Sequence, residues 1–186
     1  MQSGLRNYTN CPVIIYDINN EHIADSFITE HDKRSGTILI ASLLNNLEQG
    51  AKVNIIIVHA GGVASYNGSL RKARGEEHEI ALYNEKHRQA RGSHRHKLNT
   101  PGTINNIITK DGKQQLNPPL QVIVVNISTT GTLVKAVPGY FKLGAIIEIH
   151  LTIHGKEAIL LATVVRETKN ADSTINYGCK FMHIDK

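Results

Sequence analysis

The sequence predicts an all-β protein made of two small six-stranded antiparallel β-barrels joined by a basic linker. The chain has 186 residues, which is room for two barrels of about ninety residues each. Short apolar and β-branched segments recur along both halves, with Gly, Pro and Asn turns between them. A basic run near the midpoint, residues 86–97, separates the two halves. We therefore expect one domain at residues 1–86 and a second at residues 87–186.

The first half reads as six short strands with frequent turns. The Asn19-Asn20 pair and the glycines at 61 and 62 suit hairpin turns. Residues 41–48 fit a helical turn and a loop equally well. The expected strands are 13–18, 23–28, 37–40, 53–58, 63–70 and 79–83.

The second half repeats the pattern. Residues 147–153 alternate isoleucine or leucine with polar side chains, which is typical of a strand with one buried face. Gly112, Pro118-Pro119, and turns at 138–139, 154–155 and 170–172 are the expected separators. The expected strands are 103–108, 120–125, 132–136, 145–153, 158–165 and 176–183.

The charge of the chain is unevenly distributed. Hydrophobic residues make up 40% and charged residues 20% of the sequence, as in a globular chain. The formal net charge is +5; residues 1–86 carry 8 Lys+Arg against 10 Asp+Glu, giving −2, and the remaining residues carry 13 against 6, giving +7. A function that involves binding an anion therefore belongs to the second half.

Cysteine usage and hydropathy indicate the compartment. Cys11 and Cys179 are far apart, so the sequence favours neither a disulfide framework nor a zinc site. The N-terminal residues lack a secretory signal, and no later segment is apolar for long enough to span a membrane. We expect a cytoplasmic protein.

The basic run at 86–97, here called the arm, contains Arg88, Arg91 and Arg95. Ala90 is its single apolar residue, so we expect an exposed linker and not a core strand or helix. A guanidinium group bonds phosphate oxygens bidentately, which suits an anionic ligand. A plain solvated connector remains the alternative.

A short polar motif follows the predicted strand 120–125. Asn126, Ser128 and Gly131 form an Asn-x-Ser-x-x-Gly sequence before the next apolar stretch. Read locally, this is a turn in which the Asn and Ser side chains bond backbone amides and Gly131 permits positive φ.

The order of these motifs resembles the PilZ domain family, receptors for the bacterial second messenger cyclic di-GMP. That family carries an RxxxR arm, then [D/N]xSxxG, then a late G-x-x-F strand, matched here by Arg91 and Arg95, by the 126–131 motif and by Gly178 to Phe181. The resemblance covers the second half of the chain. The first half resembles the N-terminal split barrel of flagellar-brake-type members in its arrangement of strands.

The resemblance implies a role for each arginine of the arm. Arg91 and Arg95 are expected to take guanine edges and phosphates, and Arg88 is expected to add a phosphate or stacking contact. Guanine O6 and N7 form the edge that arginine reads bidentately.

The other predicted ligand-binding residues lie on the barrel. Asn126 and Ser128 are expected to bond the other guanine and the turn, Gly131 to keep the turn tight, and Gly178 to leave room for a base. The family more often has Asp at position 126, a charged acceptor that neutral Asn replaces here.

The resemblance also implies a mode of action. It predicts a cyclic di-GMP effector that signals to a protein partner, in motility or biofilm regulation, without enzymatic activity and without a further cofactor. The partner and the number of ligand molecules per site are left open. The chain ends at Lys186 directly after the last predicted strand, so we expect it to lack the C-terminal helix common in the family.

Three other functions compete with cyclic di-GMP binding as interpretations of this sequence. His87, His94 and His96 flank the arm, but no carboxylate or cysteine joins them, which disfavours a metal site. A single-stranded nucleic-acid-binding barrel remains an alternative, although such proteins usually display aromatic platforms and aromatics make up only 5% of this chain. The other alternative is a PilZ-like adaptor protein that has lost the ability to bind the ligand.

Overall fold

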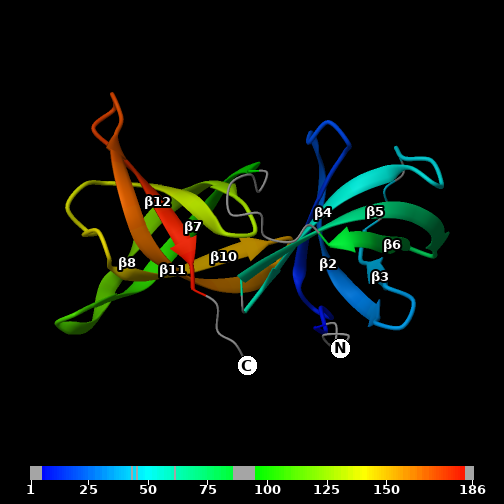
Figure 1. Cartoon of the computed structure of the whole chain (residues 1–186), viewed down its shortest axis with the longest axis horizontal. Helices are drawn as coiled ribbons and strands as arrows, with labels where there is room; N and C mark the ends of the chain where they lie inside the picture. Colours follow the sequence, from blue (N-terminus) through cyan, green and yellow to red (C-terminus); the bar gives the residue numbers. More distant parts are fainter. Residues whose placement is uncertain (1–5, 43, 45, 61, 86–94, 183–186) are drawn as a thin grey trace. The chain divides into compact units, whose positions relative to one another are not determined.

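The computed structural model describes residues 6–42, 44, 46–60, 62–85 and 95–182. Within these ranges the chain forms twelve β-strands and no helix (Figure 1). The strands close into two six-stranded barrels, β1 to β6 and β7 to β12. Every strand pair whose register is described is antiparallel. The prediction of two small antiparallel barrels is confirmed.

The first barrel has the strand order β1-β2-β3-β6-β5-β4, and β4 pairs with β1 to close it. The order is not sequential, because β3 pairs with β6. Its strands are β1 (Pro12–Tyr16), β2 (His22–Asp32), β3 (Thr37–Ile40), β4 (Lys52–His59), β5 (Gly62–Arg74) and β6 (Glu77–Glu85).

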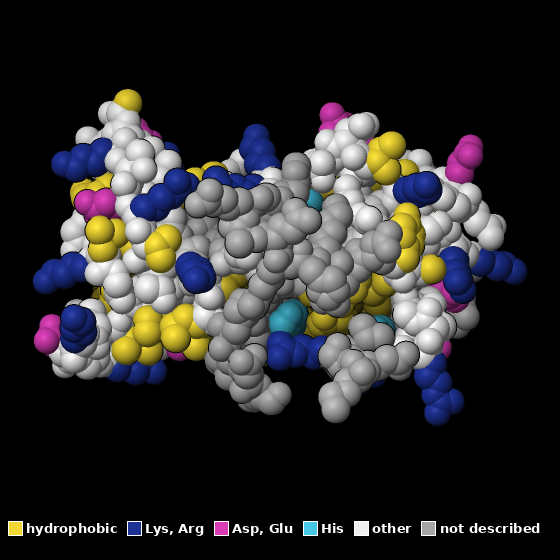
Figure 2. Space-filling model, viewed as in Figure 1, with side chains coloured by type: hydrophobic (Ala, Val, Ile, Leu, Met, Phe, Trp, Pro, Cys, Tyr) yellow, Lys and Arg dark blue, Asp and Glu magenta, His cyan; other side chains and the backbone are white. Residues whose placement is uncertain are grey.

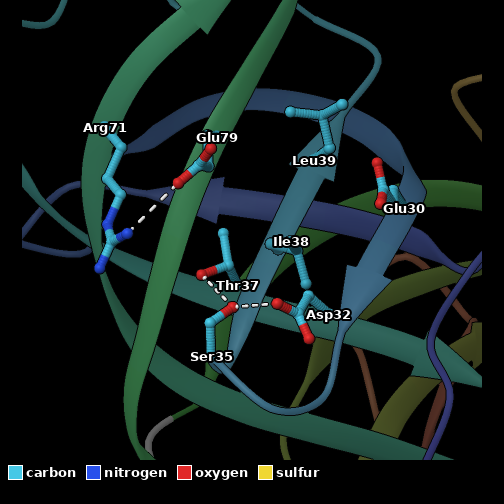
Figure 3. A pocket seen from close by; sticks show the side chains of 8 residues that line it. All are labelled: Glu30, Asp32, Ser35, Thr37, Ile38, Leu39, Arg71 and Glu79. Carbon is cyan, nitrogen blue, oxygen red and sulfur yellow. Dashed lines mark hydrogen bonds and ion pairs between the residues drawn. The ribbon is translucent and has the colours of Figure 1, made fainter.

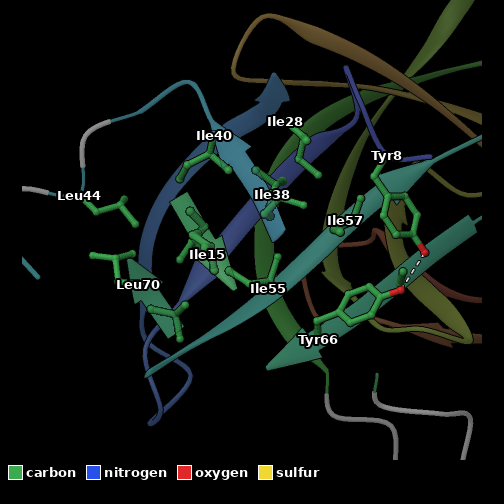
Figure 4. Close-up of a cluster of buried hydrophobic side chains, with 14 residues drawn as sticks. Tyr8, Ile15, Ile28, Ile38, Ile40, Leu44, Ile55, Ile57, Tyr66 and Leu70 are labelled. Atoms are coloured by element: carbon green, nitrogen blue, oxygen red, sulfur yellow. Dashed lines mark hydrogen bonds between the residues drawn. The ribbon is translucent and has the colours of Figure 1, made fainter. Parts of the chain in front are cut away.

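Alternate residues of these strands point into the barrel and form its core (Figure 4). Val13 and Ile15 of β1 face Ile55 and Ile57 of β4 there, because side chains two apart share one face of a strand. At one end of the core the hydroxyl groups of Tyr8 and Tyr66 lie 3.0 Å apart and share a hydrogen bond. That bond meets the need of a buried phenol for a polar partner.

In the first half, the end of the first strand differs from the prediction, and the described residues of 41–48 take one of the two expected forms. The first strand ends at Tyr16 and not at residue 18, because Asp17 accepts hydrogen bonds from the backbone N–H groups of Asn19 and Glu21 and turns the chain. Ile18 is 67% exposed as a result. The described residues of 41–48 form a loop, in which Leu44 enters the core and its N–H donates to His78 Nδ1.

The second barrel has the same strand order as the first, with β7-β8-β9-β12-β11-β10 corresponding to β1-β2-β3-β6-β5-β4. Here β9 pairs with β12, and β10 pairs with β7 to close the barrel. Its strands are β7 (His96–Thr109), β8 (Gly112–Ile127), β9 (Gly131–Ala136), β10 (Ile146–Ile153), β11 (Lys156–Lys169) and β12 (Ile175–Phe181).

The alternation predicted for residues 147–153 is present in β10. Ile147, Ile149, Leu151 and Ile153 are at most 2% exposed, and the residues between them are half-buried or exposed. The apolar side chains of the other strands meet them inside the barrel. This packing is what holds the outer surface of β8, β9, β11 and β12 in place.

Two predictions for the second half were wrong. Pro118-Pro119 do not separate strands but lie within β8, where the register jumps from Ile104↔Leu120 to Asn106↔Gln115. The two prolines fall in the residues that this jump leaves out of the ladder, so they remove no ladder hydrogen bond. Residues 96 and 97, which were expected to belong to the arm, lie in β7.

The predicted division at 86/87 falls in residues 86–94, outside the described part of the chain, and stays a prediction. The strands on either side of it, β6 and β7, belong to different barrels. No helix in the described residues is long and apolar enough to cross a membrane.

Candidate functional site

The Asn-x-Ser-x-x-Gly motif forms the tight connection between β8 and β9, here called the 126–131 turn. The Ser128 N–H donates to the Gly131 carbonyl at 2.9 Å, and the Ser128 hydroxyl donates to the same carbonyl at 3.1 Å. The Thr130 N–H in turn donates to Ser128 Oγ at 3.4 Å. Ser128 is 5% exposed. Its hydroxyl therefore shapes the turn from within, as a turn serine does.

Gly131 is required by a close approach between strands and not by its φ. Its φ lies outside the left-handed region, so the expectation of a positive φ was wrong. A Cβ at this position would collide with the carbonyl oxygen of Cys179, and it would lie 3.3 Å from the Cα of Lys180. Only glycine lets β9 come this close to β12.

Two further hydrogen bonds hold the turn to the barrel. The Thr132 hydroxyl donates to the Asn126 carbonyl at 2.6 Å, and the Phe181 N–H donates to the Thr130 carbonyl at 3.0 Å. The side-chain amide of Asn126 makes no hydrogen bond within the described part of the chain. The turn therefore offers a half-buried amide, on a fixed backbone, to an incoming group.

The pairing of β7 with β8 brings the end of the arm to this turn. His96 pairs with Ile127 and Lys97 with Asn126, so Arg95, directly before β7, lies beside the start of the turn. Arg95 is exposed, whereas His96 is only 2% exposed. The arm thus ends at residue 95, two residues before the predicted end at 97, because backbone pairing with β8 begins at His96. Arg88 and Arg91 lie outside the described residues.

Gly178 lies in β12, next to both β9 and β11. It pairs with Leu133 on one side and with Arg166 on the other. The space above it, predicted to admit a base, holds the side chain of Arg166. Sequence reasoning passed over Arg166 because it follows the predicted strand 158–165 and matches no motif. Only the pairing of β11 with β12 reveals it.

Charges on the second barrel favour an anionic ligand. Figure 2 shows Lys and Arg side chains spread over its visible face, with fewer Asp and Glu among them. Lys135 is already engaged, because its Nζ lies 2.6 Å from Asp172 Oδ2. The hydrogen bond from Lys135 lowers the pKa of Asp172 far below its usual value. Lys97 and Lys180 are exposed on strands that flank the 126–131 turn.

Nucleophilic side chains near the turn are occupied or buried. Burial raises the pKa of Cys179 to about 12, so its thiol stays protonated at neutral pH. Burial, and then the nearby Glu167, raise the pKa of Tyr177. Of the three arm histidines, two lie outside the described residues. Within the described ranges, His, Cys, Asp and Glu do not gather in any group of three that would hold a metal ion.

A surface depression of about 280 Å³ lies on the first barrel (Figure 3). Three of its charged groups have partners: Arg71 Nη1 lies 3.4 Å from Glu79 Oε1, and Asp32 accepts from the Ser35 hydroxyl at 2.7 Å. Three of its lining side chains are acidic, so it does not suit an anion. The residues that line it are Glu30, Asp32, Ser35, Thr37, Ile38, Leu39, Arg71 and Glu79.

Several solved structures are similar to this chain. Inhibitor of motility (MotI/DgrA) from Bacillus subtilis is 15% identical, with 98% of this chain and 90% of that chain covered and a TM-score of 0.36. The MrkH–c-di-GMP complex from K. pneumonia is 16% identical, with 93% and 79% covered and a TM-score of 0.37. YcgR from Escherichia coli, in complex with c-di-GMP, is 10% identical, with 95% and 77% covered and a TM-score of 0.38. These values are too low to carry an argument about function.

Comparison with curated proteins finds no match. The family model of the PilZ domain matches residues 89–186, which is more than half of the chain. The match includes Arg91, Arg95, the 126–131 turn and Gly178, and it begins one residue after Arg88. This chain therefore belongs to the PilZ domain family.

Proposed function

We propose that this protein is a cyclic di-GMP receptor that binds the dinucleotide between the arm and the 126–131 turn. The proposal is supported by one observation above all. The register of β7 against β8 pairs Lys97 with Asn126, so Arg95, two residues before Lys97, lies at the end of β7 that meets the 126–131 turn. Both Arg95 and Asn126 lie within the residues that match the PilZ domain. Arg95 and a fixed polar turn therefore lie near each other on the positively charged half of the chain.

The ligand presents two phosphates and two guanines, and the proposed residues divide between them. Arg91 and Arg95 bond a guanine edge and phosphate oxygens, and Arg88 adds a contact from further up the arm. Asn126 bonds the second guanine through its side-chain amide. Because Asn is neutral, this contact is weaker than that of an Asp at the same position.

Ser128, Gly131 and Gly178 act through the backbone. The Ser128 hydroxyl is engaged with the Gly131 carbonyl, so Ser128 fixes the shape of the turn. Gly131 lets the turn lie against β12. Because Gly178 has no side chain, it adds nothing to the outer surface of β12 at this position.

We also propose that the protein acts without catalysis and signals through a protein partner. Hydrolysis of a phosphodiester by a side chain requires an activated nucleophile. The Ser128 hydroxyl is committed to the turn, and the Cys179 thiol is buried with a raised pKa. Binding alone must then carry the signal.

Titration calorimetry with cyclic di-GMP tests the binding site. Each charge-assisted hydrogen bond contributes about 1.5 to 3 kcal/mol, so R91A and R95A are each expected to weaken binding about tenfold or more. Arg71→Ala is the matched control, because Arg71 is an exposed arginine of the first barrel. If R91A and R95A both bind as tightly as the parent, the site assignment is wrong.

The same titration separates the two alternative functions. Single-stranded DNA or RNA is expected to bind only weakly at physiological salt, because the exposed aromatic platform of such proteins is not found at the 126–131 turn. Tight oligonucleotide binding without a response to cyclic di-GMP would favour a nucleic-acid-binding barrel. Binding of neither ligand would favour the adaptor.

A further inference from the structure

Arg166 lies across Gly178 on the outer surface of the second barrel. The two residues pair between β11 and β12. A Cβ built on Gly178 would come within 2.5 Å of both Cγ and Nε of Arg166. The arginine side chain therefore runs directly over the glycine as far as Nε. A residue with a side chain at position 178 would displace it.

The charge of Arg166 is available to a ligand. Arg166 is exposed, and it makes no ion pair or hydrogen bond with any residue of the described ranges. Two other cations differ in this respect: Lys135 pairs with Asp172, and Arg71 pairs with Glu79. An arginine laid over a glycine without a carboxylate partner has no evident structural use for its charge.

Arg166 and Asn126 lie at the two ends of one row of paired residues, which crosses the neighbouring strands β11, β12, β9 and β8. Gly178 pairs with Leu133 of β9, and Leu133 pairs with Asn126 of β8. Paired strands lie about 4.8 Å apart, so about 14 Å of backbone separates Arg166 from Asn126, and the Arg166 side chain covers part of that. Leu133 points outward, because Thr132 and Val134 on either side of it are buried.

The Arg166 side chain covers Gly178, so half-buried Leu133 forms the apolar floor between Arg166 and Asn126. The flat face of a nucleobase can lie on such a floor. A hydrogen-bonding amide then stands at one end of the floor and a guanidinium at the other, which matches a ligand that carries bases and phosphates together.

We propose that Arg166 is a further ligand-binding residue of the cyclic dinucleotide site, contacting a phosphate from the barrel side. This inference rests on the proposed function above. Arg91 and Arg95 belong to an arm with a single apolar residue, so from the sequence we expect it to lose conformational entropy on binding a ligand. Arg166 is held against Gly178 beforehand, so its contact costs less. This arrangement also gives a reason for the glycine at position 178, because the Arg166 side chain occupies the space that a Cβ would need.

Calorimetry of Arg166→Ala and Arg166→Lys against cyclic di-GMP tests the contact. R166A is expected to bind about tenfold more weakly than the parent. Its affinity is also expected to fall less steeply with salt, because one ion pair with phosphate is lost. R166K keeps the charge and is expected to retain the salt dependence of the parent. Lys169→Ala, an exposed cation further along β11, is the matched control and is expected to bind as the parent does.

Substitution of Gly178 tests whether this glycine makes room for the Arg166 side chain or for the ligand itself. G178A is expected to weaken binding in the parent, because its Cβ displaces Arg166, and to have little effect in the R166A background. An equal loss in both backgrounds would show that Gly178 makes room for the ligand instead, and would overturn its assignment to Arg166. The midpoint of thermal unfolding is expected to be the same for R166A and the parent, since Arg166 is exposed and unpaired.

The possible failures are distinguishable. A parent protein that does not bind cyclic di-GMP overturns the proposed function and this inference with it. A parent that binds, together with an R166A variant of equal affinity and equal salt dependence, overturns only the role of Arg166.

Discussion

At the scale of single residues, the second barrel holds a half-buried polar contact that is sensitive to pH. Glu148 Oε1 lies 2.7 Å from His150 Nε2 and accepts from Asn106 Nδ2 at 2.9 Å, which links β10 to β7. The hydrogen bond with His150, and then the bond from Asn106, lower the pKa of Glu148 from its ordinary value of 4.5. The carboxylate form is therefore the one that stabilises the closed barrel.

This contact predicts how stability changes with pH. A pKa that is lower in the folded than in the unfolded state contributes stability above the unfolded value of 4.5, and this stability is lost as pH falls through the folded pKa. Glu148→Gln is expected to lower the free energy of unfolding at pH 7 by on the order of 1 kcal/mol. The difference from the parent should shrink below the folded pKa, where the native carboxyl is protonated too.

Urea denaturation at pH 7 and at a series of pH values below 4.5 measures this. Glu157→Gln removes an exposed carboxylate of β11 and is the control, expected to change little at any of these pH values. A Glu148→Gln variant whose deficit stays the same across the whole series would show that shape, and not charge, is what the carboxyl supplies.

At the scale of elements, the 126–131 turn depends on the packing of β9 against β12. The turn is held by the Ser128 hydroxyl, by the Thr132 hydroxyl and by the Phe181 N–H. Gly131 is the point at which the two strands come closest. The geometry of the turn therefore depends on three strands, β8, β9 and β12, and a substitution that shifts any of them is expected to change it.

Gly131→Ala is expected to disturb both folding and binding. Its Cβ collides with the Cys179 backbone, which cannot move without breaking the β9–β12 ladder, so the variant should lose about 1 to 3 kcal/mol of stability and bind cyclic di-GMP more weakly. Thermal unfolding and calorimetry measure the two effects. Gly75→Asn in the first barrel is the control, because Gly75 has open space and a φ of 64° that asparagine tolerates. A Gly131→Ala protein with the stability of the parent would contradict the close approach.

At the scale of the whole molecule, the arm connects two barrels of identical strand order. β6 ends at Glu85 and β7 begins at His96, so a ligand that pins the arm to the 126–131 turn shortens the free connection between the barrels. Arm residues with little apolar surface gain little from folding alone, and the ordering cost is about 1 to 2 kcal/mol per residue. We propose that ligand binding offsets this cost and changes the interdomain arrangement that a protein partner reads.

Hydrogen exchange and solution scattering test this switch. Saturating cyclic di-GMP is expected to protect the backbone amides of residues 86–95 and to change the scattering profile. R95A, at the same ligand concentration, is expected to show less protection of the arm. Ligand that binds but leaves both the exchange and the scattering unchanged would rule out the switch while leaving the binding site intact.

The sequence by itself determined the fold class and the family. Period-two alternation in β10 and turn residues at regular intervals predict short barrel strands, because these are local consequences of the chain. The sequence alone is enough to identify the PilZ domain. The identification rests on the spacing of Arg91 and Arg95 and on the later motif of Asn126, Ser128 and Gly131. The roles of these residues in binding remain proposals.

Tertiary structure decided what the local pattern does not contain. The start of β7 at His96 follows from pairing with β8, and the place of Pro118-Pro119 inside β8 follows from a register jump. The reason for Gly131 is the backbone of β12, and the partner of Gly178 is Arg166. Each of these depends on which strands are neighbours, and in a barrel ordered β7-β8-β9-β12-β11-β10 the decisive neighbours lie far apart in the chain. Local patterns report burial and turns, and only the closed barrel brings those distant residues into contact.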